Sequence, residues 1–435
     1  MNETAVQIKN GIIPTGYKKT EAGIIPEDWD CAKLSEIADP ITETAGKKKY
    51  ETVSISAGIG FVNQAEKFGK ELSGKQYEKY IVLKKGDFSY NKGNSGKYPQ
   101  GCIYRLKDRE TAAVPNVFES FRLKDGYCPE YYDYLFTSGF LNRQLTRKIN
   151  HGVRDDGLLN LTGKDFYDCV LPVPPLAEQK RIAEILEHCD RTIQLWEDKT
   201  AAYRNLKKIF LKKMFPQEGS NKPLIRFPGF NDAWEQRKFS DLVLIERGGS
   251  PRPIDDYITD SPDGLNWVKI GDAPEQGRYI TKTAEKIKPE GLSKTRQVQP
   301  GDLILSNSMS FGKPYIMGIN GCIHDGWLLI RDIKSRFDLK FLCHMLGTDI
   351  MLDQYRMFAA GSTVNNLNKE LVGNTTVSLP SIEEQRAIGE HLESIDNLIT
   401  LHQRKQKEET KKKKILMRTL LTGMVKKDNG KHIQR

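Results

Sequence analysis

The chain has 435 residues, of which 38% are hydrophobic and 9% aromatic, and its formal net charge is +10. This length favours two to four domains, and the aromatic content argues against a disordered chain. No apolar run approaches the roughly 18 residues of a membrane helix, and the first residues lack a signal-peptide pattern. With seven scattered cysteines and no Cys-x-x-Cys pair, these features argue against a membrane-spanning or secreted protein and favour a cytoplasmic one.

In chain order, the first feature is a region of mixed strands and helices. Short apolar or aromatic runs bounded by Gly, Pro, Asn and Asp predict strands at 80–83 and 101–106, and a helical stretch is expected at 130–148. A long helix should follow Pro174, because a seam of mostly apolar residues then alternates steps of four and three: Ile182, Leu186, Cys189, Ile193, Trp196, Thr200, Tyr203, Lys207, Phe210 and Met214. Such a heptad seam predicts a coiled coil.

A second region of the same kind follows. Strands are predicted at 302–305 and 326–330, and a helical stretch at 339–358. The second long helix starts after Pro380 and keeps the heptad phase at Ile388, Leu392, Ile395 and Ile399. The seam then becomes polar at His402, Gln406, Glu409 and Lys413, and is apolar again at Leu416 and Leu420.

The two helical segments are copies of each other, offset by 206 residues. Identical pairs include Pro174/Pro380, Glu178/Glu384, Gln179/Gln385, Ile182/Ile388, Asp190/Asp396, Leu195/Leu401 and Ile209/Ile415. So long a period excludes a solenoid and indicates a duplicated unit of one variable domain followed by one long helix. We expect the two helices to pair with each other.

The positive charge is concentrated in these helices. Residues 171–215 carry a net +3 and residues 379–435 a net +5, whereas the rest of the chain is nearly neutral. A basic excess favours a polyanionic partner. A solvated helix face is the alternative, and it is the interpretation we favour for the lysines at 411–414.

Motifs of known catalytic chemistry are not found. The glycine-rich stretch 93–97 lacks the spacing of a phosphate-binding loop, and Tyr98 stands where Ser or Thr would bind Mg²⁺. The pairs Cys322/His324 and Cys343/His344 are better explained as ordinary core residues than as metal ligands. The sequence therefore favours a binding protein over an enzyme, with no metal site and no catalytic residue.

Several motifs together resemble the specificity subunit of type I restriction–modification enzymes. They are Pro-Pro-Leu-Ala-Glu-Gln at 174–179, Gly-Ile-Ile-Pro-Glu-Asp-Trp at 23–29, Lys-Gly-Asp-Phe at 85–88 and Gly-Ser-Thr-Val-Asn-Asn-Leu at 361–367. The resemblance extends from about Gly16 to Val425. The sequence departs from the pattern at Ser381, which replaces the second proline, and at 151–156, where the first copy lacks the Gly-Ser-Thr-Val stretch.

The resemblance implies an α+β fold with two similar mixed α/β target-recognition domains joined by two long helices that form an antiparallel coiled coil. The expected segments are an N-terminal tail (1–20), recognition domain 1 (21–170), helical spacer 1 (171–218), recognition domain 2 (219–378), helical spacer 2 (379–425) and a basic C-terminal tail (426–435).

The function that the resemblance implies is sequence recognition. Each domain would read one half of a bipartite, asymmetric site in double-stranded DNA, and the helices would dock two methyltransferase (modification) subunits and set the half-site spacing. Restriction subunits would join that complex. No cofactor is expected in this chain, because S-adenosylmethionine, ATP and Mg²⁺ would belong to the partners. The expected location is the cytoplasm of a prokaryote.

Base readout requires a few Arg, Lys, Asn or Gln side chains on polar loops. The candidate DNA-binding residues of the first domain are Lys47, Lys48, Lys49, Asn91, Lys92, Asn94, Ser95 and Lys97. Those of the second are Arg247, Ser250, Arg252, Ser306, Asn307, Ser308, Ser310 and Lys313. The candidate partner-docking residues are Pro174, Glu178, Gln179, Pro380, Glu384 and Gln385.

Three alternatives stay open from the residues alone. The chain could be the specificity subunit of a related bipartite-site nuclease whose partner fuses methylation and cleavage. It could be a non-catalytic coiled-coil scaffold, although two large variable domains argue against that. It could also be a nucleic-acid enzyme with an unrecognised site, which the missing motifs disfavour.

Overall fold

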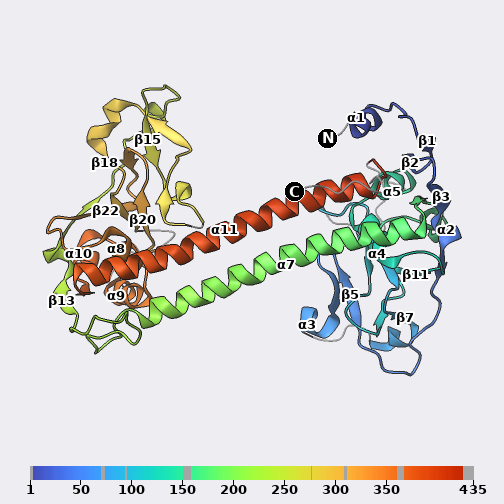
Figure 1. Cartoon of the computed structure of the whole chain (residues 1–435), viewed down its shortest axis with the longest axis horizontal. Helices are drawn as coiled ribbons and strands as arrows, with labels where there is room; N and C mark the ends of the chain where they lie inside the picture. Colours follow the sequence, from blue (N-terminus) through green and yellow to red (C-terminus); the bar gives the residue numbers. More distant parts are fainter. Residues whose placement is uncertain are drawn as a thin grey trace. The chain divides into compact units, whose positions relative to one another are not determined.

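The computed structural model describes residues 3–69, 74–93, 96–149, 158–275, 277–307, 311–359 and 367–424. The chain divides into two compact units, which we call unit 1 (Met1–Ile193 and Lys407–Arg435) and unit 2 (Gln194–Gln406). The division falls inside both long helices, α7 (Leu176–Lys213) and α11 (Ile382–Leu420), drawn in green and red in Figure 1. No helix in the described ranges is long and apolar enough to cross a membrane.

Besides parts of α7 and α11, unit 1 contains short helices and small sheets. The helices are α1 (Glu3–Lys9), α2 (Leu34–Ile37), α3 (Gln64–Phe68), η1 (Gly74–Lys79), α4 (Pro129–Thr137), α5 (Asn142–Lys148) and α6 (Gly163–Tyr167). The strands are β1 (Tyr17–Thr20), β2 (Gly23–Pro26), β3 (Asp30–Lys33), β4 (Ala38–Pro40), β5 (Val53–Ser56), β6 (Gly60–Asn63), β7 (Ile81–Lys84), β8 (Phe88–Asn91), β9 (Cys102–Arg105), β10 (Thr111–Val114), β11 (Glu119–Leu123) and β12 (Val170–Val173). The largest sheet has the order β4-β11-β8-β9, and β1–β2, β5–β6, β7–β10 and β3–β12 pair separately.

The core of unit 1 joins this sheet to the helices. Phe88 stacks on Phe121 with ring centroids 5.3 Å apart, and Tyr90 stacks on Phe166 at 4.7 Å. The same core contains residues from the start of α7 and, from the end of α11, Leu420 together with the adjacent Leu421. Since these helix ends supply core side chains, they are part of the domain rather than appended to it.

Unit 2 repeats this plan with larger sheets. Its helices, besides α7 and α11, are η2 (Phe239–Asp241), η3 (Ile254–Asp256), η4 (Ile270–Asp272), η5 (Pro289–Lys294), α8 (Leu339–Leu346), α9 (Asp349–Ala359) and α10 (Lys369–Gly373). Its strands are β13 (Glu235–Lys238), β14 (Val243–Arg247), β15 (Leu265–Val268), β16 (Tyr279–Ile280), β17 (Glu285–Ile287), β18 (Arg296–Val298), β19 (Leu303–Ser306), β20 (Pro314–Met317), β21 (Gly321–Ile323), β22 (Trp327–Asp332) and β23 (Thr376–Leu379). They form sheets of order β14-β22-β19-β20-β16 and β17-β15-β21-β18, with β13 and β23 paired separately.

Within each unit, stretches of α7 and α11 lie antiparallel. In unit 2, His402 of α11 lies against Trp196 and Tyr203 of α7, with ring centroids 5.2 Å away in both cases. In unit 1, Asp190 near the start of α7 pairs with Lys413 near the end of α11. The polar residues predicted in the seam of the second helix, such as His402 and Lys413, thus contact polar or aromatic residues of α7. The α+β fold and the antiparallel helix pair are confirmed.

The helical stretches predicted at 130–148 and 339–358 are each two helices. Gly139 adopts a left-handed φ of 78°, which ends α4 before α5 begins. Between α8 and α9, the hydroxyl of Thr348 accepts a hydrogen bond from the Met351 N–H at 3.4 Å, and this caps the start of α9. Apolar periodicity passes through both breaks, so the pattern alone does not reveal them.

Candidate nucleic-acid interface

In unit 2, the two loops that the sequence predicts to bind DNA both contact a turn at 323–327. The backbone carbonyl of Asp325 accepts hydrogen bonds from Arg247 Nε at 3.3 Å and from Asn307 Nδ2 at 2.8 Å. The Asp325 carboxylate lies 3.7 Å from a terminal guanidinium nitrogen of Arg252. Two arginines and an asparagine, from two loops about 60 residues apart in sequence, therefore share one acceptor residue. These are side-chain types that read guanine and adenine edges.

Backbone hydrogen bonds hold the second of these loops in place. The N–H and carbonyl of Ser306 pair with Lys313 and Gly312, and the Ser306 hydroxyl also accepts from the Lys313 N–H at 2.9 Å. Lys313 is exposed, and its Nζ lies 5.4 Å from the centroid of the Tyr315 ring. Ser306 and Asn307 are buried, so among the described residues of this loop Lys313 is the one with an exposed side chain. The predicted residues Ser308 and Ser310 lie outside the described ranges.

A cavity of about 890 Å³ opens beside the loop that carries Ser250 and Arg252. Its lining includes Ser250, Arg252, Lys269 and His324, with the buried ring of Trp267. The Ser250 hydroxyl is buried and has no hydrogen-bond partner in the part of the chain that the structure describes. A buried polar atom without a partner is uncommon, and this one lies within a loop assigned to DNA from the sequence.

The predicted loop of unit 1 that begins at Asn91 is hydrogen-bonded to a neighbouring hairpin. Asn91 at the end of β8 donates from Nδ2 to the carbonyl of Ile55 in β5 at 3.2 Å, and its Oδ1 accepts from the Gly93 N–H at 2.8 Å. Lys92 pairs with Glu119 at 2.8 Å and has only 14% of its side chain exposed. Lys97 is exposed. It is therefore the better phosphate contact of the two lysines, while Asn94 and Ser95 lie outside the described ranges.

The predicted lysine triplet Lys47, Lys48 and Lys49 lies in the loop before β5, and all three side chains are exposed. The Lys48 carbonyl accepts a hydrogen bond from the Tyr77 hydroxyl at 2.7 Å. Because Asn91 contacts the far end of β5, the triplet and the 91–97 loop lie at opposite ends of this strand. The two predicted loops of unit 1 are not gathered on one residue as those of unit 2 are.

The predicted docking residues Gln179 and Gln385 serve a different role, as internal clamps. Gln179 is 1% exposed, accepts from the Cys128 N–H at 2.9 Å and donates to the Pro174 carbonyl at 2.8 Å. Gln385 is 2% exposed and repeats this with the Asp338 N–H at 3.0 Å and the Pro380 carbonyl at 3.1 Å. Each glutamine thus joins the start of a long helix to the N-cap residue just before α4 or α8.

The predicted docking glutamates are also engaged inside the chain. Glu178 accepts from Trp29 Nε1 at 2.9 Å. Glu384 is 1% exposed and accepts two hydrogen bonds from Arg226, both at 2.7 Å. Trp234, the sequence counterpart of Trp29, has a buried Nε1 without a partner in the described residues. Gln179, Glu384 and Gln385 are buried and have internal partners in this chain, which argues against docking through these three side chains, and the docking role stays a prediction. The repeated Pro-x-x-x-Glu-Gln stretch holds each domain to its helix.

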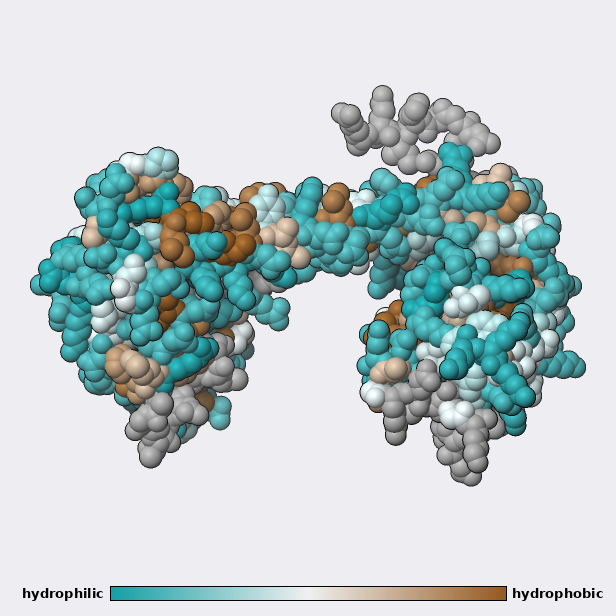
Figure 2. All heavy atoms as spheres, turned by 90° about the horizontal axis from the view of Figure 1, so that it is seen from below, coloured by the Kyte–Doolittle hydropathy of each residue, from teal (hydrophilic) through white to brown (hydrophobic). Residues whose placement is uncertain are grey.

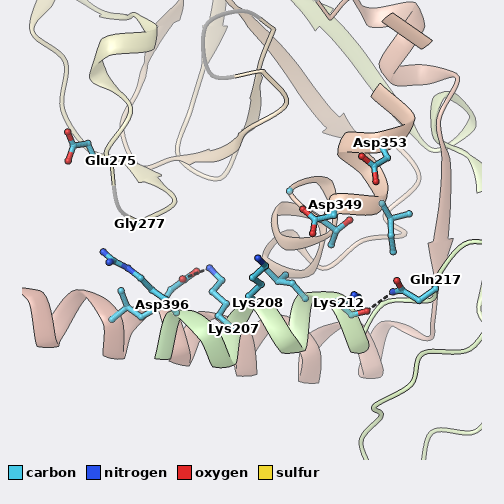
Figure 3. A pocket seen from close by; sticks show the side chains of 15 residues that line it. Lys207, Lys208, Lys212, Gln217, Glu275, Gly277, Asp349, Asp353 and Asp396 are labelled. Atoms are coloured by element: carbon cyan, nitrogen blue, oxygen red, sulfur yellow. Dashed lines mark hydrogen bonds and ion pairs between the residues drawn. The ribbon is translucent and has the colours of Figure 1, made fainter. Parts of the chain in front are cut away.

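A charged cluster in unit 2 was not predicted. Asp396 of α11 pairs with Lys207 of α7 and with Arg278 Nε, the latter at 3.2 Å. The pair lines a pocket of about 880 Å³ whose floor carries further lysines of α7 and whose opposite wall carries Glu275, as Figure 3 shows. Burial, reinforced by Arg278, lowers the pKa of Lys207 to about 8. One carboxylate thus serves two cations.

Histidine and cysteine are packing groups in this unit. Burial holds the pKa of His344 well below its usual range, so its imidazole is neutral at pH 7. Burial likewise raises the pKa of the Cys343 thiol. Within the described ranges, no group of three His, Cys, Asp or Glu side chains is placed to hold a metal ion.

Comparison with known proteins identifies the family. The family described as "Type I restriction modification DNA specificity domain" matches residues 26–202 and 231–412, which together are most of the chain. The chain belongs to the type I restriction–modification DNA specificity family. The two matched segments each contain one mixed domain and the larger part of one long helix. Membership of this specificity family confirms the resemblance seen in the motifs, and with it the interpretation as a DNA-recognition subunit rather than an enzyme.

Curated relatives match over nearly their full length. The type I restriction enzyme MjaVIII specificity subunit of Methanocaldococcus jannaschii is 27% identical over 431 residues, covering 95% of this chain and 96% of the relative. The putative type I restriction enzyme MjaX specificity subunit of the same organism is 25% identical over 432 residues, covering 94% and 96%.

Solved structures share the fold at lower identity. A chain from a study of complex assembly and conformational transition in the type I restriction–modification system has a TM-score of 0.55 at 19% identity, covering 92% of this chain and 99% of that one. The type I restriction–modification S subunit from M. genitalium has a TM-score of 0.54 at 14% identity, covering 92% and 97%.

Proposed function

We propose that this chain is the DNA-reading subunit of a type I restriction–modification complex, and that each unit reads one half of a bipartite, asymmetric site. The observation that carries this proposal is the duplicated clamp. Gln179 and Gln385 make equivalent hydrogen bonds in the two units, so each domain is tied to the start of its own helix in the same way. Two similar domains with different loops are suited to reading two different half-sites.

Each unit has its own set of side chains for this task. In unit 2, Arg247, Arg252 and Asn307 meet at Asp325. In unit 1, the corresponding groups are Asn91 and Lys97, and the lysine triplet at 47–49 lies in the loop at the other end of β5. Because the domains are nearly neutral overall, and phosphate contacts dominate DNA affinity, partner subunits must supply much of the attraction to the backbone. We therefore expect weak DNA binding by the isolated chain.

We assign partner docking to an apolar stripe on the long helices. This stripe takes the place of the buried glutamines as the candidate docking surface. Leu195, Leu206 and Ile209 of α7 are 50%, 38% and 46% exposed. With 100° per residue, these three lie within about 60° of one another and roughly 100° away from the seam that faces α11. On the face drawn in Figure 2, hydrophobic groups in brown interrupt a mainly hydrophilic surface, including along the helices.

Two of the three stripe positions recur as apolar residues on α11, whereas the counterpart of Leu206 is Lys412. Leu401 and Ile415 of α11 occupy the positions of Leu195 and Ile209 at the offset of 206, and they are 45% and 63% exposed. Exposed apolar side chains that recur at matching positions are suited to burying the apolar face of a helical partner. The partners of the proposal are two modification (methyltransferase) subunits, to which restriction subunits add.

The proposal assigns no cofactor to this chain. S-adenosylmethionine would be bound by the modification subunits, and ATP and Mg²⁺ by the restriction subunits. The place of action is the cytoplasm of a prokaryotic cell, where DNA is accessible and the seven cysteines stay reduced.

Methylome sequencing of cells that express this chain with its modification partner tests the proposal. The expected result is one methylated motif made of two specified half-sites with a fixed unspecified gap, and a continuous motif would contradict it.

The same readout tests the spacer role of the helices. Seven residues add about 10 Å of helix and keep the heptad phase. Matched insertions after Thr200 and after Gln406 should lengthen the gap by about one to three base pairs without changing the half-sites.

A further inference from the structure

A hairpin tip in unit 1 presents an isoleucine to solvent. Strands β5 and β6 pair from Val53↔Asn63 to Ser56↔Gly60, and three residues, 57–59, form the turn between them. Ile59 in this turn is 75% exposed, whereas Val53 of the same hairpin is fully buried. Single exposed apolar residues are common on protein surfaces. This one is distinguished by the groups that fix the tip and by those that surround it.

The tip is held by two tyrosines. The Gly58 N–H donates to the Tyr104 hydroxyl at 2.8 Å, and the Tyr104 ring packs on the small core formed around β5 and β7. The Tyr98 hydroxyl lies so close that a Cβ on Gly58 would be 2.9 Å from it. Because folding has already ordered this tip, placing Ile59 against a ligand costs little further conformational entropy.

The tip is continuous with the candidate DNA-binding loop. Asn91 donates to the Ile55 carbonyl at 3.2 Å, which ties the loop to the strand that leads into the turn. Lys97 is linked to the turn through Tyr98, because its Nζ lies 5.9 Å from the centroid of the Tyr98 ring and the Tyr98 hydroxyl lies close to Gly58. The turn that carries Ile59 is therefore connected, through Ile55 and Tyr98, to an amide and a cation assigned to DNA.

We propose that Ile59 is an apolar wedge that enters between two base pairs of the half-site read by unit 1. This inference rests on the proposed function. Apolar side chains that enter a base step partly unstack it and kink the duplex, and pyrimidine–purine steps deform at the lowest cost. Gly58 and Gly60, with φ of 83° and 110°, leave no side chains beside Ile59 to block the approach of the bases.

Among the described residues, the candidate interface of unit 2 has no counterpart of this isoleucine tip. The candidate interface of unit 2 is polar and is organised by Asp325, with Arg247, Arg252 and Asn307 around it. Besides the base that each modification subunit flips out for methylation, we therefore expect an unstacked step that depends on Ile59 in the half-site of unit 1 only. The half-site of unit 2 is then an internal control on the same DNA molecule.

The test uses the full chain assembled with its modification subunits, and duplexes with 2-aminopurine at single steps of either half-site. Binding should raise the fluorescence at one step of the unit 1 half-site. Ile59→Ala should abolish this rise and weaken binding about tenfold, which is the loss expected for most of one buried isoleucine side chain. The slope of log affinity against log salt should not change, because no ion contact is lost.

Two further variants control the result. Ile59→Leu should keep both fluorescence and affinity, because it keeps an apolar wedge. Leu224→Ala in unit 2, where Leu224 is 74% exposed, should change neither. Wild-type affinity and fluorescence in Ile59→Ala would overturn the wedge and leave the proposed function intact, as would weaker binding with the fluorescence rise retained. If the wild-type complex bound no split site, the proposed function would fail and the wedge with it.

Discussion

Lys207 of α7 and Asp396 of α11 form an ion pair in unit 2, and the same pairing recurs with the helices exchanged in unit 1, between Lys413 and Asp190. Both lysines and both aspartates are related by the offset of 206 residues. Polar groups in a coiled-coil seam fix register and orientation. The duplicated pair therefore favours one antiparallel alignment of the two helices.

The two pairs should differ in strength because their surroundings differ. Asp396→Asn leaves Lys207 and Arg278 without their carboxylate, and both cations are mostly buried. We expect a loss of about 3 kcal/mol in the free energy of unfolding. Asp190 is 45% exposed, pairs with one lysine and accepts a hydrogen bond from the Tyr134 hydroxyl at 2.7 Å, which an asparagine oxygen can still accept. Asp190→Asn should therefore cost about 1 kcal/mol or less. Chemical denaturation of the two variants side by side measures both losses in the free energy of unfolding. Equal losses would contradict the expected difference in strength between the two ion pairs.

Lys207 makes the free energy of unfolding of unit 2 depend on pH in the alkaline range. Burial lowers the pKa of Lys207 to about 8 in the folded chain, whereas an unfolded lysine titrates near 10.4. Between these values the unfolded state binds the extra proton, so the free energy of unfolding rises with pH in this window. Below pH 8 the folded chain bears the full cost of a buried charge.

Lys207→Met removes that cost, while Asp396 keeps Arg278 as a partner. The variant should be more stable than the wild type by roughly 3 kcal/mol at pH 7, and the difference should disappear towards pH 10.5. Thermal unfolding from pH 7 to pH 10.5 checks this, with the exposed neighbour Lys208→Met as the control. A difference that is independent of pH would contradict the lowered pKa.

The glutamine clamp should be a local stability element of each unit. Gln385→Leu leaves the Asp338 N–H and the carbonyls of Arg336 and Pro380 without their partner. An unsatisfied buried group costs about 1–3 kcal/mol. Hydrogen exchange should become faster at the start of α8 and stay unchanged in α4. Gln179→Leu is the matched control and should show the reverse, whereas faster exchange in both units from either variant would argue against separate clamps.

The apolar stripe should determine how many modification subunits bind. Leu195→Glu combined with Ile209→Glu places charges on exposed positions of α7, and Leu401→Glu combined with Ile415→Glu does so on α11. Each pair should reduce the complex from two modification subunits to one, and all four substitutions should abolish it, with unchanged thermal unfolding of the chain alone. Mass measurement of the purified complex gives the count. Two bound subunits in every variant would exclude the stripe.

The repeat, the two long helices and the strands at 80–83, 101–106, 302–305 and 326–330 could be predicted from the sequence, because they depend on local periodicity and on self-similarity. The clamp could not. Glu178 and Gln179 look like surface residues of a first helical turn, and only the fold brings Cys128 and Trp29 to them. A repeated polar pair indicates a shared role, but it does not tell an internal contact from a docking one.

The same limit applies to the candidate interface. The loops at 247–252 and 306–313 could be found from their Gly, Ser and Arg content. Asp325, which residues of both loops contact, lies on a third segment whose sequence does not indicate a DNA-binding loop. The neighbouring His324 drew attention only as a metal ligand in the sequence, yet it lines the cavity beside Arg252. Long-range contacts of this kind have no counterpart in a local pattern.

Each unit should read its half-site independently of the other, and an exchange of one recognition domain tests this. Residues 24–170 would be replaced by the matching segment of a relative with a different target, leaving Pro174, Gln179 and the long helices in place. Methylome sequencing of cells that carry this chimaera and the modification subunit would then give its motif. One half-site should change to that of the relative, while the other half-site and the gap should stay the same. A change in both half-sites would contradict it.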